Sequence, residues 1–173
     1  MPETNQLPLN GIKVVEFTHM VMGPAVGIIL ADLGADVIKV EPIGGDATRK
    51  LKGSGAGYFS MYNRNKRSIC LDRHPQLRDM YFGNYTKLVY QAQVKDPKLE
   101  EKARDCAERL GLAYNDLIKD HPGLIFCHAK GFLNGPYEHR TALDEVAQMM
   151  GGLAYMTGPP GRPWRAGASV IDV

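Results

Sequence analysis

The sequence predicts an α/β protein with a Rossmann-like parallel sheet and flanking helices. The first observation is that a strand-like run, a helix-like run and a second strand-like run follow one another between residues 11 and 41. A strand–helix–strand unit of this length joins two parallel strands through a right-handed crossover. The second observation is that another strand-like run and another helix-like run follow between residues 124 and 151. This alternation is typical of α/β domains.

The elements of the first unit have clear boundaries. The stretch "GIKVVEF", Gly11–Phe17, is compact and rich in β-branched residues, as expected of a buried strand. In "PAVGIILADLG", Pro24 suits the first turn of a helix and Gly34 suits its end. The stretch "ADVIKVE", Ala35–Glu41, is the second predicted strand.

Two more elements are predicted nearer the carboxyl terminus. The stretch "LIFCHAK", Leu124–Lys130, follows a His-Pro-Gly turn signal and is predicted to be a strand. The stretch "TALDEVAQMMGG" is predicted to be a helix, in which Thr141 and Asp144 fit a capping box and Gly151 supplies the exit.

The segment between residues 72 and 109 is harder to interpret. "DPKLEEKARDCAERLG" has the apolar spacing of a helix. "DMYFGNYTKLVYQAQV" has mixed periodicity, and a hairpin around Gly83 and Asn84 is one interpretation of it.

Composition excludes several classes of protein. The chain has 173 residues, the length of one domain, and its 44% hydrophobic and 23% charged residues argue against disorder. Its three cysteines are far apart and form no Cys-x-x-Cys pair, which argues against a disulfide framework or a zinc site. The first residues lack the features of a signal peptide, and the longest uncharged apolar run, Met20–Ala31, is too short to span a bilayer. We therefore expect a cytoplasmic protein with no membrane partner.

The net charge of +2 is unevenly distributed along the chain. Residues 49–73 contain seven basic residues and one acidic residue, Asp72. A basic stretch of this kind is either a solvated loop or a surface for a polyanionic partner.

Sequence motifs for nucleotides and thiol chemistry are weak. "GSGAG", residues 53–57, follows no predicted strand and is better explained as a loop than as a dinucleotide fingerprint. Adjacent side chains of a strand point to opposite faces, so Cys127 and His128 cannot pair as nucleophile and base. His19 follows the first strand, where open α/β sheets place ligands, and is either a site residue or a solvated loop histidine.

Asp172 is the strongest candidate for a catalytic residue. It follows two β-branched residues, so we expect a carboxylate at the tip of a short strand, in apolar surroundings that would make it more reactive. The alternative interpretation is an exposed polar chain end.

Six stretches, taken in order, resemble the family III CoA-transferases, the L-carnitine dehydratase/bile-acid-inducible type. They are "LPLNGIKVVEFTHMVMGP", "LADLGADVIKVEPIGGDATR", "MYNRNKRSICLD", "ERLGLAYNDL", "GPYEHRTALDEVAQMMGGLAYMTGPPG" and "RAGASVID". Members of that family are more than twice as long. The resemblance therefore implies that residues 1–173 are the amino-terminal portion of the large CoA-binding α/β domain, without the carboxy-terminal half.

The resemblance implies an activity and a set of site residues. The family moves CoA from an acyl-CoA to a carboxylic acid through an aspartyl-CoA thioester. It has no tightly bound cofactor or metal and no nucleic-acid partner, and it forms an interlocked homodimer. The catalytic aspartate corresponds to Asp172. The remaining positions are implied to contact CoA or the substrate: His19, Met20 and Val21 at the thioester end, Leu71 and His74 at the adenosine, Arg109 at the phosphates, and Asp144 close to the nucleophile.

The sequence departs from the family pattern in three places. Formyl-CoA/oxalate enzymes carry a glutamine at Val21 and an adenine-stacking arginine at Pro42, so those substrates are not implied. The acid-Asn-aromatic loop that grips CoA is missing between residues 72 and 109, where a local frameshift would explain the sequence. Leu143 stands where α-methylacyl-CoA racemases carry their histidine, which argues against that activity.

Two alternatives to a CoA-transferase remain, a relative of the racemases and a truncated, inactive CoA-binding remnant. We expect the 173-residue chain alone to be inactive, because the resemblance implies that the family's glycine-rich loop and second domain lie beyond residue 173.

Overall fold

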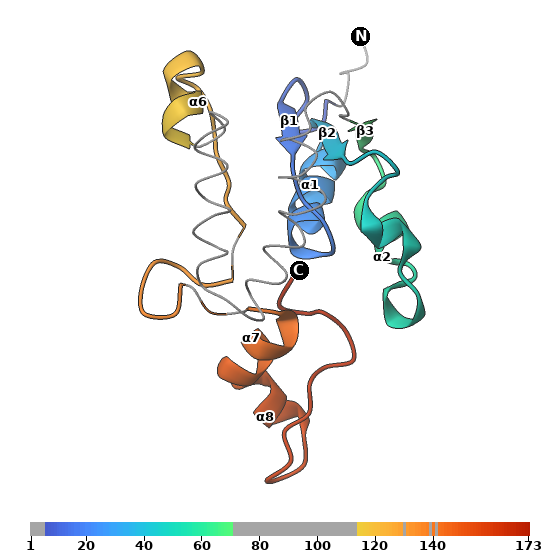
Figure 1. The fold of residues 1–173 in the computed structure, drawn as a ribbon, viewed down its shortest axis with the longest axis vertical. Coiled ribbons are helices and arrows are strands. Elements are labelled where there is room, and N and C mark those ends of the chain that lie inside the picture. The colour runs from blue at the N-terminus through green and yellow to red at the C-terminus, as the bar shows by residue number, and fades with distance from the viewer. Residues whose placement is uncertain (1–5, 71–113, 130, 139, 141) are drawn as a thin grey trace. The chain divides into compact units, whose positions relative to one another are not determined.

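The computed structural model describes residues 6–70, 114–129, 131–138, 140 and 142–173. It separates into two compact units. Figure 1 labels their helices and strands. Unit 1 contains Met1–Arg78 together with Asp172–Val173, and unit 2 contains Asp79–Ile171. Each unit is described by itself.

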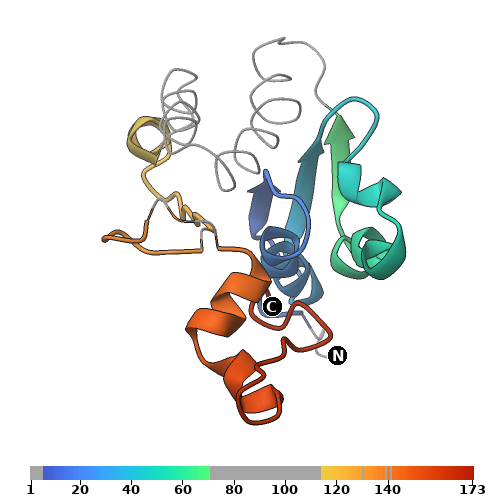
Figure 2. The same cartoon turned by 60° about the horizontal axis from the view of Figure 1, so that its bottom comes forward.

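Unit 1 is a parallel sheet with helices. Its elements are β1 (Lys13–Glu16), α1 (Met22–Asp32), β2 (Asp36–Glu41), the 3-10 turns η1 (Ala47–Lys50) and η2 (Gly53–Gly55), α2 (Tyr58–Tyr62) and β3 (Arg67–Cys70). The strands lie side by side in the order β1-β2-β3, and both pairs are parallel (Figure 2).

The predicted strand–helix–strand unit is confirmed in the structure. Val14 pairs with Val37 across β1 and β2, and α1 provides the crossover between these strands. Leu33 ends α1, and Gly34 follows with φ of 102°, a conformation that glycine adopts without strain. The sequence analysis did not predict β3 or α2.

A small apolar core holds α1 against the sheet. Its buried residues are Ala31, Ala35 and Val37, and three partly buried residues pack on them: Leu9, Val14 and Leu30. Small side chains at the end of α1 let the helix approach the strands closely, because packing in protein interiors leaves few voids.

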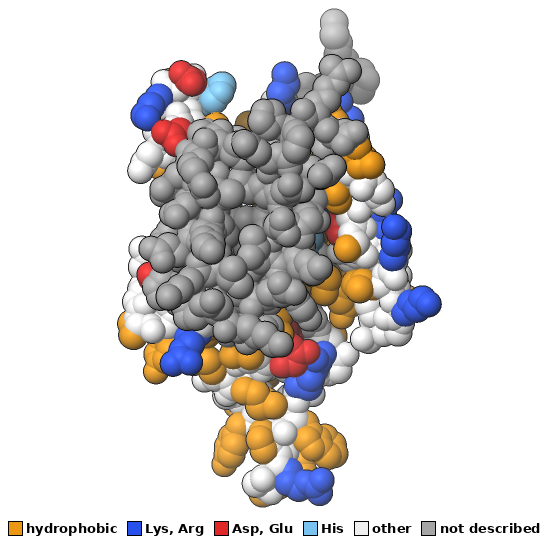
Figure 3. All heavy atoms as spheres, in the orientation of Figure 1, with side chains coloured by type: hydrophobic (Ala, Val, Ile, Leu, Met, Phe, Trp, Pro, Cys, Tyr) orange, Lys and Arg blue, Asp and Glu red, His pale blue; other side chains and the backbone are white. Residues whose placement is uncertain are grey.

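Unit 2 contains α6 (Tyr114–Asp120), α7 (Asp144–Met150) and α8 (Leu153–Thr157). The turn between α7 and α8 is made by Gly152, whose φ is 82°. Large apolar side chains, among them Tyr155 and Met156, lie exposed on α8 (Figure 3). Among the described residues, no helix is both long and apolar enough to cross a membrane.

Two predicted strands are wrong. The described part of the run Leu124–Lys130 has no regular secondary structure, and neither has the run that leads to Asp172. Apolar, β-branched runs become strands only where a neighbouring strand pairs with them. The sheet of the described residues contains β1, β2 and β3 alone.

Candidate functional site

The loop that follows β1 lies at the carboxyl end of a parallel strand, where open α/β sheets bind ligands. Met20 in this loop has φ of 63°, a left-handed conformation that residues other than glycine adopt only when their surroundings hold them there. Lys39 Nζ donates a hydrogen bond to the carbonyl oxygen of Thr18 at 2.8 Å, and the Met20 N–H donates to Thr48 Oγ1 at 3.2 Å. The loop backbone is therefore held on both sides of its histidine.

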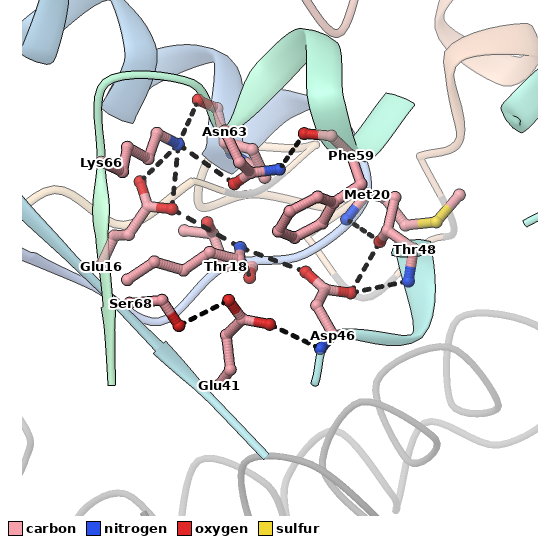
Figure 4. Close-up of polar contacts among 12 residues, drawn as sticks. Glu16, Thr18, Met20, Glu41, Asp46, Thr48, Phe59, Asn63, Lys66 and Ser68 are labelled. Atoms are coloured by element: carbon pink, nitrogen blue, oxygen red, sulfur yellow. Dashed lines mark hydrogen bonds and ion pairs between the residues drawn. The ribbon is translucent and has the colours of Figure 1, made fainter. Parts of the chain in front are cut away.

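Lys39 belongs to a buried cluster of four charged side chains. Its other members, Glu16, Asp46 and Lys66, are labelled in Figure 4. Lys39 Nζ lies 3.1 Å from Asp46 Oδ2 and 3.5 Å from Glu16 Oε1. Lys66 Nζ lies 3.0 Å from the same Glu16 oxygen, and all four side chains are at most 5% exposed. Two ammonium groups face two carboxylates, so the cluster is neutral, which is how proteins accommodate buried charge.

Asp46 connects this cluster to the loop. Its Oδ1 accepts hydrogen bonds from the N–H of Thr48 at 2.8 Å and from the Thr48 hydroxyl at 2.7 Å. Because that hydroxyl donates to Asp46, its oxygen lone pairs can accept the Met20 N–H. The conformation of Met20 thus depends on contacts that begin at the buried pair of Asp46 and Lys39.

Two glycines of α1 allow the loop and the cluster to approach the helix. A Cβ atom on Gly27 would lie 1.7 Å from Glu16 Oε2 and 2.8 Å from Lys66 Nζ. A Cβ atom on Gly23 would lie 2.5 Å from Thr18 Cβ. A larger residue at either position would displace the cluster or the loop.

Glu41, at the end of β2, holds the chain that follows it. Its side chain is 1% exposed and accepts hydrogen bonds from Arg49 Nε at 2.8 Å, Arg49 Nη2 at 2.6 Å, Ser68 Oγ at 2.7 Å and the Asp46 N–H at 2.8 Å. Burial by itself raises the pKa of this carboxyl. The hydrogen bonds from Arg49, Asp46 and Ser68, with the charge of Arg49, outweigh burial and lower the pKa from 4.5 to about 2.

We expect Glu41 to set part of the acid stability of the protein. Its pKa is lower in the folded state, so its contribution to the free energy of unfolding is complete above about pH 4.5 and is lost as the pH falls toward 2. The shift corresponds to roughly 3 kcal/mol. Urea unfolding between about pH 6 and about pH 3 should show this loss in the wild type. In Glu41→Gln, the free energy of unfolding should depend less on pH over the same range. Equal acid sensitivity of the two proteins would contradict the assignment.

His19 is half-buried in the loop after β1. Burial lowers the pKa of its imidazole below the usual 6.5, the charge of Asp46 opposes this shift, and the charge of Lys39 adds to it. The imidazole is therefore largely neutral at pH 7, and it can donate or accept a hydrogen bond at this position.

In unit 2, α7 contacts the irregular segment that precedes Asp172. Asp144 and Gln148 lie one turn apart on this helix and are 4% and 0% exposed. Asp144 Oδ1 accepts a hydrogen bond from the Ile171 N–H at 2.7 Å. The predicted capping box is wrong, because Leu143 is the N-cap of α7 and no side chain caps the helix through a hydrogen bond. Asp172 follows Ile171 directly and is half-buried.

The family model described as CoA-transferase family III matches residues 9–173. This match covers nearly the whole chain. The chain belongs to CoA-transferase family III. The family resemblance seen in the sequence is thereby confirmed.

Curated relatives of this family III chain are CoA-transferases. It is 38% identical over 180 residues to succinate–glutarate CoA-transferase of Agrobacterium fabrum, an alignment that covers 96% of this chain and 43% of the relative. It is also 38% identical over 171 residues to formyl-CoA:oxalate CoA-transferase of Afipia carboxidovorans, covering 95% and 39%. The chain thus spans about two-fifths of the length of these relatives.

Solved structures confirm the fold class of the family III chain. A CAIB/BAIF family protein from Brucella suis has a TM-score of 0.72 at 35% identity, covering 97% of this chain and 46% of that one. The hypothetical protein Rv3272 from Mycobacterium tuberculosis has a TM-score of 0.70 at 31% identity, covering 96% and 46%.

The structure describes some of the site residues that the family resemblance implies, and the others lie outside the described residues. His19, Met20 and Val21 lie together in the loop after β1, and Val21 is the buried N-cap of α1. Asp144 and the segment leading to Asp172 are joined by the hydrogen bond from Ile171. The other implied positions lie outside the described residues: Leu71, His74 and Arg109. Their roles toward CoA stay predictions.

The basic stretch of this family III chain, residues 49–73, has less unpaired positive charge in its described part than its composition suggests. The Lys66 side chain is buried against Glu16. Three arginines form ion pairs with carboxylates of the same unit: Arg49 with Glu41, Arg64 with Asp32, and Arg67 with Asp36. Lys50 and Lys52 are exposed. Much of the positive charge in the described part of this stretch is therefore neutralised inside unit 1.

The residues that hold the loop after β1 and the segment leading to Asp172 were not predicted from the sequence. They include Lys39, Thr48 and Gln148. One available signal was the lysine inside "DVIKVE". A charged residue in a strand that is buried on both faces needs a buried partner. The sequence gives no means of identifying that partner, because Asp46 follows the strand in an irregular loop.

Proposed function

We propose that the full-length enzyme transfers CoA from an acyl-CoA to a carboxylic acid through a thioester on Asp172. By full-length enzyme we mean a polypeptide that carries residues 1–173 with the further length present in its relatives. In it, residues 1–173 form the amino-terminal portion of the CoA-binding domain. The observation that carries this proposal is the family match over residues 9–173, supported by relatives that are named as CoA-transferases.

The proposed reaction proceeds through two covalent forms of Asp172. Its carboxylate attacks the thioester carbonyl of the donor, and the CoA thiolate leaves, giving a mixed anhydride. The thiolate then attacks the aspartyl carbonyl, releasing the donor acid and leaving aspartyl-CoA. The acceptor carboxylate attacks this thioester, and the CoA thiolate leaves again, giving a second anhydride. Attack of the thiolate on the acceptor carbonyl then restores Asp172 and releases the new acyl-CoA.

The first step explains why the reaction needs a protein. A carboxylate with an ordinary pKa of ~4 displaces a thiolate with a pKa of ~8.5, so the anhydride lies several kcal/mol uphill. Binding energy from the distant nucleotide part of CoA must offset this difference and keep the thiolate beside the aspartate. Water must also be kept from the anhydride, because hydrolysis would waste it.

The loop after β1 is suited to the thioester end of CoA. Its backbone is held on both sides of His19, and the imidazole is largely neutral near pH 7, so it adds no charge beside the reacting carbonyl. We propose that His19, Met20 and Val21 contact this part of the substrate.

Steady-state kinetics of the full-length enzyme test the proposed function. With varied acyl-CoA at several fixed concentrations of carboxylate, we expect net formation of the new acyl-CoA. Formation of the new acyl-CoA should require the acceptor carboxylate, because the CoA of the aspartyl-CoA enzyme is passed to that acid. Hydrolysis of acyl-CoA without transfer to any acceptor would contradict the proposal.

A further inference from the structure

The segment that leads to Asp172 has no regular secondary structure between residues 165 and 171. Its backbone N–H and C=O groups therefore lack the ladder partners that a strand would provide. Polar backbone groups that leave water need other partners, because an unpaired buried group is costly. In unit 2, α7 supplies partners for the N–H groups of Ala166 and Ile171 and for the carbonyl oxygen of Ala168.

Gln148 supplies two of these contacts through both ends of its amide. Its Oε1 accepts a hydrogen bond from the Ala166 N–H at 2.7 Å, and its Nε2 donates to the Ala168 carbonyl oxygen at 3.2 Å. Nε2 also donates to Asp144 Oδ2. Gln148 is 0% exposed, so its amide has no access to solvent as an alternative partner.

The two α7 side chains act on the same stretch of backbone. Asp144 and Gln148 are four residues apart, which places them on one face of the helix. Gln148 holds the segment at residues 166 and 168, and Asp144 holds it at Ile171. The hydrogen bond between the two side chains fixes the orientation of the Asp144 carboxylate. The backbone is thus fixed up to the residue that immediately precedes Asp172.

We infer that Gln148 is a positioning residue that orients Asp172 for attack on the thioester; this inference rests on the proposed function. Only an amide offers both a carbonyl acceptor for Ala166 and an N–H donor for Ala168 and Asp144 at this position. A glutamate keeps the acceptor but places a second carboxylate against Asp144, and an apolar residue of the same size loses all three hydrogen bonds. A shift of about 1 Å at a reacting group lowers rates on the order of a hundred-fold.

The test uses two variants of the full-length enzyme. Gln148→Met fills the same space without hydrogen bonds. Glu145→Gln is the matched control, because Glu145 lies on the same helix and pairs with Arg165 of the same segment, but that pair is exposed. For each folded variant, the rate of hydroxylamine-trapped adduct formation on Asp172 is measured in a single turnover, with the KM for the acyl-CoA.

We expect Gln148→Met to slow adduct formation by roughly ten- to a hundred-fold, with a KM within about three-fold of the wild-type value. Glu145→Gln should react at nearly the wild-type rate. A merely structural Gln148 would change the thermal stability but leave the single-turnover rate of the folded molecules unchanged. A Gln148→Met enzyme that traps at the wild-type rate therefore overturns the inference.

Amide hydrogen exchange of the wild-type enzyme keeps the inference testable if the Met variant does not fold. The N–H groups of Ala166 and Ile171 should be protected although no strand or helix contains them. Rapid exchange of both groups would overturn the inference. Absence of any Asp172 adduct in the wild type would instead overturn the proposed function, and protection of the same two amides would still support the tether by α7.

Discussion

Replacing Asp172 by Ala in the full-length enzyme should lower the rate of CoA transfer by at least about a thousand-fold, because the proposed mechanism forms both covalent intermediates on this side chain. The fold should remain, since Asp172 follows a segment that is held through the Ile171 N–H and residues 166 and 168. Transfer rates measured with saturating acyl-CoA, together with thermal unfolding, check both parts of this prediction.

A control for this variant is Asp116→Ala, which removes an exposed carboxylate from α6 in unit 2. Asp116 pairs with Lys119 on the surface, and such pairs contribute little to the stability of the fold. This control should transfer CoA at nearly the wild-type rate. If Asp172→Ala and Asp116→Ala were equally active, Asp172 would not be the nucleophile.

The second large effect is expected from Lys39→Met, which removes the central charge of the buried cluster while keeping most of the side-chain volume. Asp46 Oδ2 would lose the only ammonium group that faces it at ion-pair distance in the described structure, and the Thr18 carbonyl would lose its donor. Breaking a buried pair in this way typically lowers the free energy of unfolding by about 3–5 kcal/mol. Urea unfolding at neutral pH measures this loss.

Two comparisons make the Lys39 prediction specific. Arg67→Met removes an exposed pair with Asp36 and should leave the free energy of unfolding nearly unchanged, because solvent screens such a pair. The double variant Lys39→Met/Asp46→Asn removes both charges, and the Asn Oδ1 atom can still accept from Thr48. It should therefore recover part of the lost stability. A double variant that is destabilised by the sum of its single effects would show that Lys39 and Asp46 do not depend on each other.

The sequence was sufficient to predict the part of the fold that rests on local signals. The strand–helix–strand unit over residues 11–41 could be predicted because Pro24 and Gly34 mark the helix and β-branched runs mark the strands. The strand predicted over Leu124–Lys130 was wrong, because strand formation there does not rest on local signals alone. Whether such a run becomes a strand depends on a partner elsewhere in the chain.

The candidate site could be predicted only in part. His19 and Asp172 were predicted from their places after apolar runs and from the family resemblance, and their roles stay predictions. The residues that hold their surroundings, Lys39 and Gln148, could not be found in this way. Their roles depend on contacts across 20 or 21 residues of sequence, with the Ala168 and Thr18 carbonyls. Such contacts arise from tertiary packing, which periodicity and spacing do not encode.

The most direct measurement of the central claim is the mass of the peptide that contains Asp172 after reaction. The full-length enzyme is mixed with an acyl-CoA and hydroxylamine, digested and analysed by mass spectrometry. We expect a hydroxamate on Asp172 that forms only when acyl-CoA is present. A hydroxamate on another carboxylate, or an unmodified Asp172 peptide in an enzyme that is transferring CoA, would contradict it.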